Sequence, residues 1–107
     1  MNKPLTRSSV VRTLRKELPR LRSKYGVEKM ALFGSFAKGT ATKRSDVDIL
    51  VQLRRPLGLE FVRLALELEK ALDRKVDLVT FDTFQRGVEH PRYARVASDI
   101  EGTLRYV

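Results

Sequence analysis

The chain has 107 residues, of which 42% are hydrophobic and 33% are charged, and this balance predicts one globular domain spanning residues 1–107. The absence of cysteine excludes disulfides, thiolate-bound zinc and a cysteine nucleophile, and the single histidine, His90, excludes a multi-histidine metal site within one chain. Any bound metal must therefore be held mainly by carboxylates, which favours Mg2+ or Mn2+ over Zn2+.

The charge is strongly positive and unevenly distributed. The net charge is +9, and residues 1–30 hold nine Lys or Arg residues against two Glu. Such an excess attracts phosphates, RNA or an acidic partner, unless it is only the solvated face of a basic helix. No apolar run approaches the roughly 20 residues of a membrane span, and no apolar signal segment follows the N-terminus. We therefore expect a cytoplasmic protein that does not enter a membrane.

The first predicted element is a helix over residues 6–25. Its apolar residues recur at the spacing of one helix face: Val10, Val11, Leu14, Leu18, Leu21 and Tyr25. Thr6, Ser8 or Ser9 can cap its start, and Gly26 can end it. Pro19 lies inside the pattern and predicts either a kink or a division into two helices.

The remaining elements follow in chain order. They are a strand over residues 28–34, a short helical turn over 35–38, a strand over 46–52, a helix over 58–73, a strand over 75–81, a helix over about 91–101 and a short strand near 103–106. This order predicts a mixed α/β (α+β) domain, in which helices pack on a small mixed β-sheet.

The strand over 46–52 begins with two acidic residues, Asp46 and Asp48. Side chains two apart in a strand point to one face, so both carboxylates share a face with Leu50, while the alternate apolar residues pack against helices. Carboxylates this close repel each other, so one of them should have a raised pKa unless a divalent cation is bound. Because Mg2+ is typically bound by one or two carboxylates plus substrate phosphates, the pair is a candidate platform for a triphosphate and its metal.

Two further features extend this candidate site. Asp77 joins the pair if its strand neighbours residues 46–52, and is otherwise an edge residue facing solvent. Gly34-Ser35 follows the first strand, where glycine allows close approach of a ligand, and the turn can hold phosphate oxygens unless Ser35 merely caps it. The segment is not a Walker A loop, since Thr40 stands where that motif requires lysine.

Together these residues resemble the polymerase-beta-like nucleotidyltransferase superfamily, and most of all its minimal nucleotidyltransferase branch, which is often encoded beside HEPN proteins. The resemblance covers most of residues 19–82. It rests on four stretches: Tyr25-Gly26-Val27, Leu32-Phe33-Gly34-Ser35-Phe36-Ala37-Lys38-Gly39, Ser45-Asp46-Val47-Asp48-Ile49-Leu50-Val51 and Lys75-Val76-Asp77-Leu78-Val79.

The resemblance implies a role for each matching residue. Three would be catalytic and would bind metal, with the last also helping to activate the attacking hydroxyl: Asp46, Asp48 and Asp77. Four would contact the nucleotide: Gly34, Ser35, Lys38 and Ser45. Lys38 stands where the family usually has arginine, which keeps the charge but loses the planar fork. The implied reaction transfers AMP from ATP, with Mg2+ (or Mn2+) as cofactor and pyrophosphate as leaving group.

Three functions compete on this basis. The resemblance implies an antitoxin that adenylylates a tyrosine of a HEPN-type toxin. The alternatives are an antitoxin that acts by docking alone and a nucleic-acid-binding module built on residues 1–30. The intact carboxylates favour the enzyme, and residues 1–30 contain only one aromatic residue, Tyr25, whereas single-strand binders combine basic and aromatic residues.

A chain of this size offers no obvious acceptor-binding domain. We therefore expect another chain, either a partner or a second copy in a homo-oligomer, to complete the acceptor site. His90, Arg54 and Arg55 can line the site, but surface roles are favoured for all three.

Overall fold

The computed structural model describes residues 5–89 and 104–107. Its elements are, in chain order, α1 (Arg7–Tyr25), β1 (Val27–Phe33), α2 (Gly34–Lys38), β2 (Val47–Leu53), α3 (Glu60–Leu72), β3 (Val76–Thr80), α4 (Phe81–Glu89) and β4 (Arg105–Tyr106). The predicted mixed α/β class is confirmed. The predicted helix over 91–101 and His90 lie outside the described residues.

The four strands form one sheet in the order β3-β2-β1-β4. β1 runs antiparallel to β2 and to β4, whereas β2 and β3 are parallel, so the sheet is mixed as predicted. α3 connects the parallel pair β2 and β3, as such a pair requires a crossover. β2 is therefore a central strand with partners on both edges.

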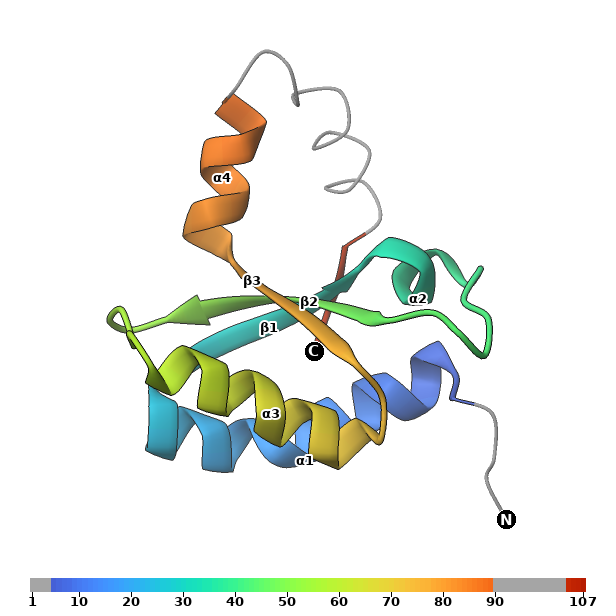
Figure 1. Ribbon diagram of the computed structural model, residues 1–107, viewed down its shortest axis with the longest axis horizontal. Helices are drawn as coiled ribbons and strands as arrows, with labels where there is room; N and C mark the ends of the chain where they lie inside the picture. Colours follow the sequence, from blue (N-terminus) through green and yellow to red (C-terminus); the bar gives the residue numbers. More distant parts are fainter. Residues whose placement is uncertain (1–4, 90–103) are drawn as a thin grey trace.

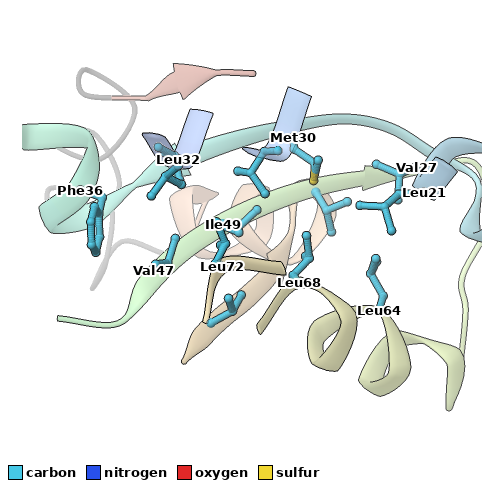
Figure 2. Close-up of a cluster of buried hydrophobic side chains, with 14 of the residues drawn as sticks. Leu21, Val27, Met30, Leu32, Phe36, Val47, Ile49, Leu64, Leu68 and Leu72 are labelled. Carbon is cyan, nitrogen blue, oxygen red and sulfur yellow. The ribbon is translucent and has the colours of Figure 1, made fainter. Parts of the chain in front are cut away.

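The core lies between the sheet and two helices. α1 and α3 cover one face, and α4 stands on the opposite face (Figure 1). Figure 2 shows the buried cluster on the first face, to which α3 contributes one residue per turn: Leu64, Leu68 and Leu72. The alternation predicted for β2 is confirmed, because the core receives Val47, Ile49 and Val51.

The opposite face of β2 is covered along part of its length. Leu50, which shares that face with Asp48, is fully buried, and α4 contacts both β2 and β3. Both ends of this face are open to solvent, because Asp48 is partly exposed and Gln52 at the far end is exposed. In the described part of the chain, no helix is both long and apolar enough to cross a membrane.

α1 is one continuous helix, so the alternative of two helices is wrong. Thr6 caps its start by accepting a hydrogen bond from the backbone N–H of Ser9, and Gly26 ends it in the left-handed conformation with φ 73°. Pro19 lies on the exposed side between buried Leu14 and Leu21. The packing of those leucines on the sheet keeps the helix intact across the missing hydrogen bond.

Several predicted boundaries differ from the structure by one or two residues, and three of these corrections have a clear physical reason. Gly34 leaves the strand and opens α2, because its φ of 70° is not extended backbone. Asp46 precedes β2, which begins at Val47, where the backbone N–H of Val47 bonds to the carbonyl of Lys75 at 2.9 Å. Phe81 belongs to α4 and not to β3, because the Thr80 hydroxyl accepts the N–H of Thr83 at 3.0 Å and caps a helix that the pattern did not predict.

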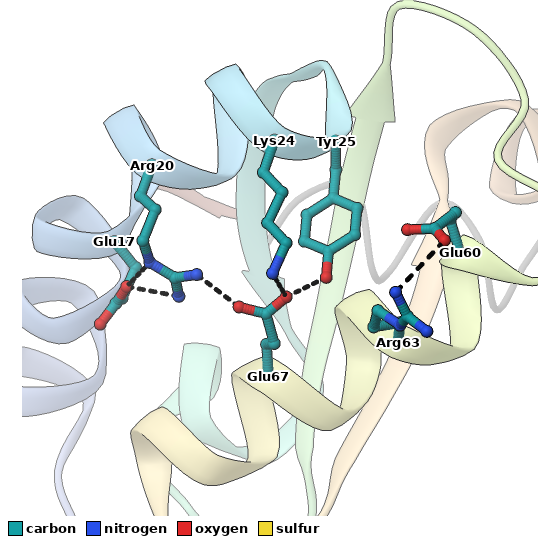
Figure 3. A network of polar contacts seen from close by, with 7 residues as sticks. All are labelled: Glu17, Arg20, Lys24, Tyr25, Glu60, Arg63 and Glu67. Atoms are coloured by element: carbon teal, nitrogen blue, oxygen red, sulfur yellow. Dashed lines mark hydrogen bonds and ion pairs between the residues drawn. The ribbon is translucent and has the colours of Figure 1, made fainter.

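A polar cluster joins α1 to α3 at their exposed edge (Figure 3). Glu67 of α3 accepts hydrogen bonds from Arg20, from Lys24 at 2.9 Å and from the hydroxyl of Tyr25. The hydrogen bond from Arg20 is the largest cause that lowers the pKa of Glu67. Because three donors of α1 converge on one carboxylate of α3, the cluster fixes the position of the two helices relative to each other.

The orientation of α3 can be tested by two matched truncations on the same helix. Leu68 is 1% exposed and Leu66 is 57% exposed. We expect Leu68→Ala to lower the free energy of unfolding by about 2–5 kcal/mol, because it leaves a cavity in the core. Leu66→Ala should cost less than about 0.5 kcal/mol. Urea denaturation of both variants measures the difference, and equal losses would contradict the described face of α3.

Candidate active site

The register of the sheet brings two aspartates together at one end of β2. Asp48 on β2 pairs with Asp77 on parallel β3, and on its other side it pairs with Phe33, the last residue of β1. Paired residues point to the same face of a sheet, on strands about 4.8 Å apart. Asp48 therefore lies between Asp77 and the turn that begins at Gly34. This is the arrangement expected if the third strand neighbours the second.

This arrangement raises the pKa of Asp48. Partial burial, the largest cause, and the neighbouring carboxylates of Asp77 and Asp46 together raise the pKa of Asp48 to about 6. The expected repulsion among the carboxylates is thereby confirmed. Asp46 contributes from the exposed loop that precedes β2, and Asp77 is likewise exposed.

Gly34 lies directly against the Asp48 carboxylate. A Cβ atom at this position would overlap Oδ2 of Asp48 and lie 3.0 Å from its Cγ. The backbone also takes φ 70°, a conformation that residues with side chains rarely adopt. Both constraints demand glycine, so the β1–α2 turn and the central carboxylate form one unit. Ser35, the next residue, is partly buried in the same turn.

The loop that carries Asp46 is tied to its surroundings by Arg74. Its guanidinium donates to the carbonyl of Ser45 at 3.0 Å and lies 5.9 Å from the ring centroid of Phe36 in α2. The Ser45 hydroxyl accepts the backbone N–H of Thr42 at 2.8 Å, which closes the turn before Asp46. Sequence reasoning missed Arg74, because a single arginine after a helix carries no signal among 22 basic residues.

The other predicted basic residues lie apart from this unit. Lys38 is exposed at the C-terminal end of α2, and no described contact links it to the carboxylates. Arg54 and Arg55 follow the opposite end of β2, where they line a hollow of about 560 Å³ together with Phe81 and Arg86. The structure thus supports surface roles for Arg54 and Arg55 and does not bring them to the aspartates.

The donor chemistry at this end of the sheet suits a divalent cation. Within residues 5–89 and 104–107, no group of three or more acidic, His or Cys side chains converges as a preformed metal site. The oxygens of Asp46, Asp48 and Asp77 are hard ligands, and the repulsion at Asp48 is the kind that a cation relieves. Such a donor set fits an ion that shares its ligands with a triphosphate, as Mg2+ commonly does.

A mixed sheet that holds aspartates against a glycine turn at the end of a central strand is the arrangement expected from the resemblance to the nucleotidyltransferases. The chain belongs to the nucleotidyltransferase domain family, whose sequence profile matches residues 11–106. This confirms the family that the motif indicated, together with its fold and enzyme class. Nucleoside triphosphates and divalent metal ions are general requirements of this family.

Similar known proteins support the nucleotidyltransferase assignment over most of the chain. A Methanocaldococcus jannaschii protein that is provisionally named a protein adenylyltransferase is 39% identical over 105 residues, which cover 95% of this chain and 98% of that protein. The solved structure of a provisionally identified minimal nucleotidyltransferase matches with a TM-score of 0.68 and 28% identity, covering 96% of this chain and 97% of that chain. A chain in a crystal structure of a toxin–antitoxin with AMP-PNP matches with a TM-score of 0.53 and 32% identity, covering 74% of this chain and 60% of that chain.

Two glycines allow the contact at Gly34 to be tested against a matched control. Gly34 and Gly39 both have positive φ, at 70° and 79°, but nothing lies within 4 Å of a Cβ at Gly39. In both alanine variants the strain of the left-handed conformation lowers the folding stability by about 1–2 kcal/mol. We expect only Gly34→Ala to lower nucleotidyl transfer by about 100-fold, because it displaces Asp48. Equal rates per folded molecule in both variants would contradict this role.

Asp48→Asn should stabilise the metal-free protein at neutral pH. A pKa raised to about 6 means that the folded state binds the Asp48 proton more tightly than the unfolded state, whose value is near 3.8. The protonated Asp48 carboxyl therefore contributes to the free energy of unfolding below about pH 4, and this contribution is lost as the pH rises through 6. Removing the charge should raise Tm at pH 8 by a few °C, and by less at pH 4.

Thermal melts in EDTA at both pH values measure this effect. Asp82→Asn is the control, because Asp82 is an exposed aspartate of α4 whose ion pair with Arg86 spans 3.3 Å. A lower Tm of Asp48→Asn at pH 8 would show that the Asp48 charge is already compensated in the folded chain.

Proposed function

We propose that this chain transfers AMP from ATP to a tyrosine hydroxyl of a HEPN-type toxin and so acts as its antitoxin. The observation that carries the proposal is the unit formed by Gly34, Asp48 and Asp77, which brings a phosphate-binding turn against strand-end carboxylates. Adenylyl transfer is supported by the protein adenylyltransferase name of the 39% identical relative. The antitoxin role is supported by the similar chain in the toxin–antitoxin structure with AMP-PNP.

In this proposal the aspartates have separate tasks. Asp46 and Asp48 would hold Mg2+ (or Mn2+) together with the triphosphate, and the metal would supply charge stabilisation for the attacking and leaving oxygens. Asp77 accepts the proton of the attacking hydroxyl. The hydroxyl oxygen forms a bond to the α-phosphorus, the bond from that phosphorus to the bridging oxygen breaks, and pyrophosphate leaves.

The turn and its neighbours hold the nucleotide. Backbone N–H groups at Gly34 and the hydroxyl of Ser35 bind phosphate oxygens, as the family resemblance implies, and the metal held by Asp48 would offset the repulsion between that carboxylate and the phosphates. Lys38 adds a positive charge at the end of α2, which favours a pyrophosphate leaving group. Ser45 also contacts the nucleotide in this proposal, through a hydroxyl that accepts the backbone N–H of Thr42 at 2.8 Å and lies 3.3 Å from the Thr42 hydroxyl.

The acceptor side of the site is supplied by another chain. The three carboxylates lie at a strand end where Asp46 and Asp77 are exposed, and the described residues place no further layer over them. A protein acceptor can approach this open end and bring its tyrosine to Asp77. The partner therefore completes the site, and the chain alone should show little transfer.

Label transfer decides between catalysis and docking. The purified chain is incubated with Mg2+ and α-labelled ATP, with and without the product of the adjacent gene, which is the candidate toxin. We expect label on the toxin with the wild type, and at least about 100-fold less with Asp46→Asn, whose residual metal affinity is low. Asp82→Asn, a change of the same kind on exposed α4, should transfer label at the wild-type rate.

Two results would reject the proposal. If no toxin is labelled and Asp46→Asn still neutralises the toxin, the chain acts by docking alone. If label moves to free tyrosine or to RNA and not to the toxin, the enzyme class stands but the acceptor is wrong.

A further inference from the structure

An aromatic and basic patch lies on the face of the sheet that carries α4, opposite α1 and α3 (Figure 1). Lys29 of β1 pairs with Gln52 of β2, and Tyr106 of β4 pairs with Ala31 of β1. Ala31 in turn pairs with Leu50, the buried residue of β2 on the α4 face. Because directly paired residues of neighbouring strands point to one face, the side chains of Lys29, Gln52 and Tyr106 all lie on the α4 face.

Two aromatic rings form the middle of this patch. Phe81, the first residue of α4, stacks on Tyr106 with ring centroids 6.1 Å apart and planes 12° from parallel. The ammonium of Lys29 lies 5.0 Å from the ring centroid of Phe81 and 5.5 Å from that of Tyr106. Tyr106 is nevertheless 53% exposed. The ring pair therefore presents an aromatic surface to solvent, directly beside a positive charge.

Phe81 also lines the hollow of about 560 Å³ at the far end of β2. Three arginines and two glutamines line the same hollow: Arg54, Arg55, Arg86, Gln52 and Gln85. Asp82 lines it too and pairs with Arg86 at 3.3 Å. Arg54 and Arg55, in contrast, form no ion pair with a carboxylate in the part of the chain that the structure describes. Because Phe81 belongs to both features, the basic hollow and the ring pair are adjacent.

The patch is separate from the carboxylates of the candidate active site. Gln52 follows Asp48 by four residues on the same face of β2, which places them about 13 Å apart at roughly 3.3 Å per residue. Leu50 lies between them and is fully buried. A ligand in the hollow therefore needs no contact with the aspartates.

We propose that this patch binds an unpaired nucleotide with its phosphate, as single-stranded RNA presents it. Guanidinium groups form forked hydrogen bonds with phosphate oxygens, and an exposed ring stacks on an unpaired base. The amides of Gln52 and Gln85 can donate to and accept from the edges of bases. An acidic peptide would engage the arginines but would leave the rings and amides without a role.

A free mononucleotide has the same chemistry, but the extent of the patch favours a strand. The patch reaches from β2 across β1 to β4, which are two strand spacings or about 10 Å. Several linked nucleotides can occupy the hollow and the ring pair together. The proposal is independent of the adenylylation proposed above, because it uses none of the carboxylates.

Binding of a fluorescein-labelled oligouridylate to the full chain tests the patch. Fluorescence anisotropy is measured in EDTA, so that the carboxylates hold no metal, between about 50 and 200 mM salt. Arg54→Ala/Arg55→Ala should weaken binding about tenfold and lower the slope of log K against log salt by about 1.4, or about 0.7 for each lost phosphate contact. The control Arg12→Ala/Arg15→Ala removes the same charge from exposed positions of α1, across the sheet from the patch, and should leave affinity nearly unchanged.

Tyr106 provides a second readout that charge alone does not move. Tyr106→Leu should weaken binding about fivefold or more without changing the salt slope, and Tyr106→Phe should bind as the wild type does. Thermal melts show that each variant is folded before its binding is compared. Uridine monophosphate serves as competitor: displacement at equal nucleotide concentration supports the patch with a free nucleotide as ligand, and displacement only by unlabelled oligouridylate supports it with RNA.

Three outcomes would overturn the proposal. Equal weakening by the two arginine double variants would show that net charge attracts the RNA without a site. Wild-type binding by Tyr106→Leu would show that the ring takes no part. Displacement by polyglutamate as effective as by unlabelled oligouridylate would assign the hollow to an acidic protein surface.

Discussion

Repulsion between carboxylates on neighbouring strands is the constraint around which this site is built. Asp48 and Asp77 are held in register although their charges oppose it, because the residues beside them in the strands are apolar and buried. Moving Asp48 away would take Val47 and Ile49 out of the core, and each such side chain contributes about 1.5–3 kcal/mol when it is buried. The burial of one face of β2 therefore holds Asp48 in place on the other face, next to Asp77. A cation with its triphosphate can relieve the repulsion between the two carboxylates.

The surrounding elements hold β2 and its aspartates in position. Gly34 permits the first turn to approach Asp48 without a steric clash, and Arg74 holds the loop that carries Asp46 through the carbonyl of Ser45. α1 and α3 bury the apolar face of the sheet, and their contacts through Glu67 keep them in position. The candidate site is therefore organised within one chain, and Asp46 and Asp77 are exposed at its open end in the described structure.

Local pattern predicted most elements but not their ends. Strand alternation correctly separated the core residues of β2 from Asp48, because that period depends only on backbone geometry. The extended strand assignment of Phe81 was wrong, and α4 was missed, because the Thr80 cap is a weak signal beside an apolar strand. Pro19 predicted a kink or a break, yet tertiary packing of the flanking leucines kept α1 in one piece. Short-range rules do not include that packing energy.

By itself, the sequence determined which residues make up the candidate nucleotide site. Gly34-Ser35 and Asp46-x-Asp48 lie within a short segment, so their spacing and alternation could be read directly. Only the tertiary structure decided that Asp77 pairs with Asp48, because strand order depends on how α3 crosses the sheet. It likewise decided that β4 pairs with the edge of β1, which no local pattern could show, since the two strands are far apart in the chain. Contacts between distant segments depend on the packing of the whole domain, and local periodicity carries no information about it.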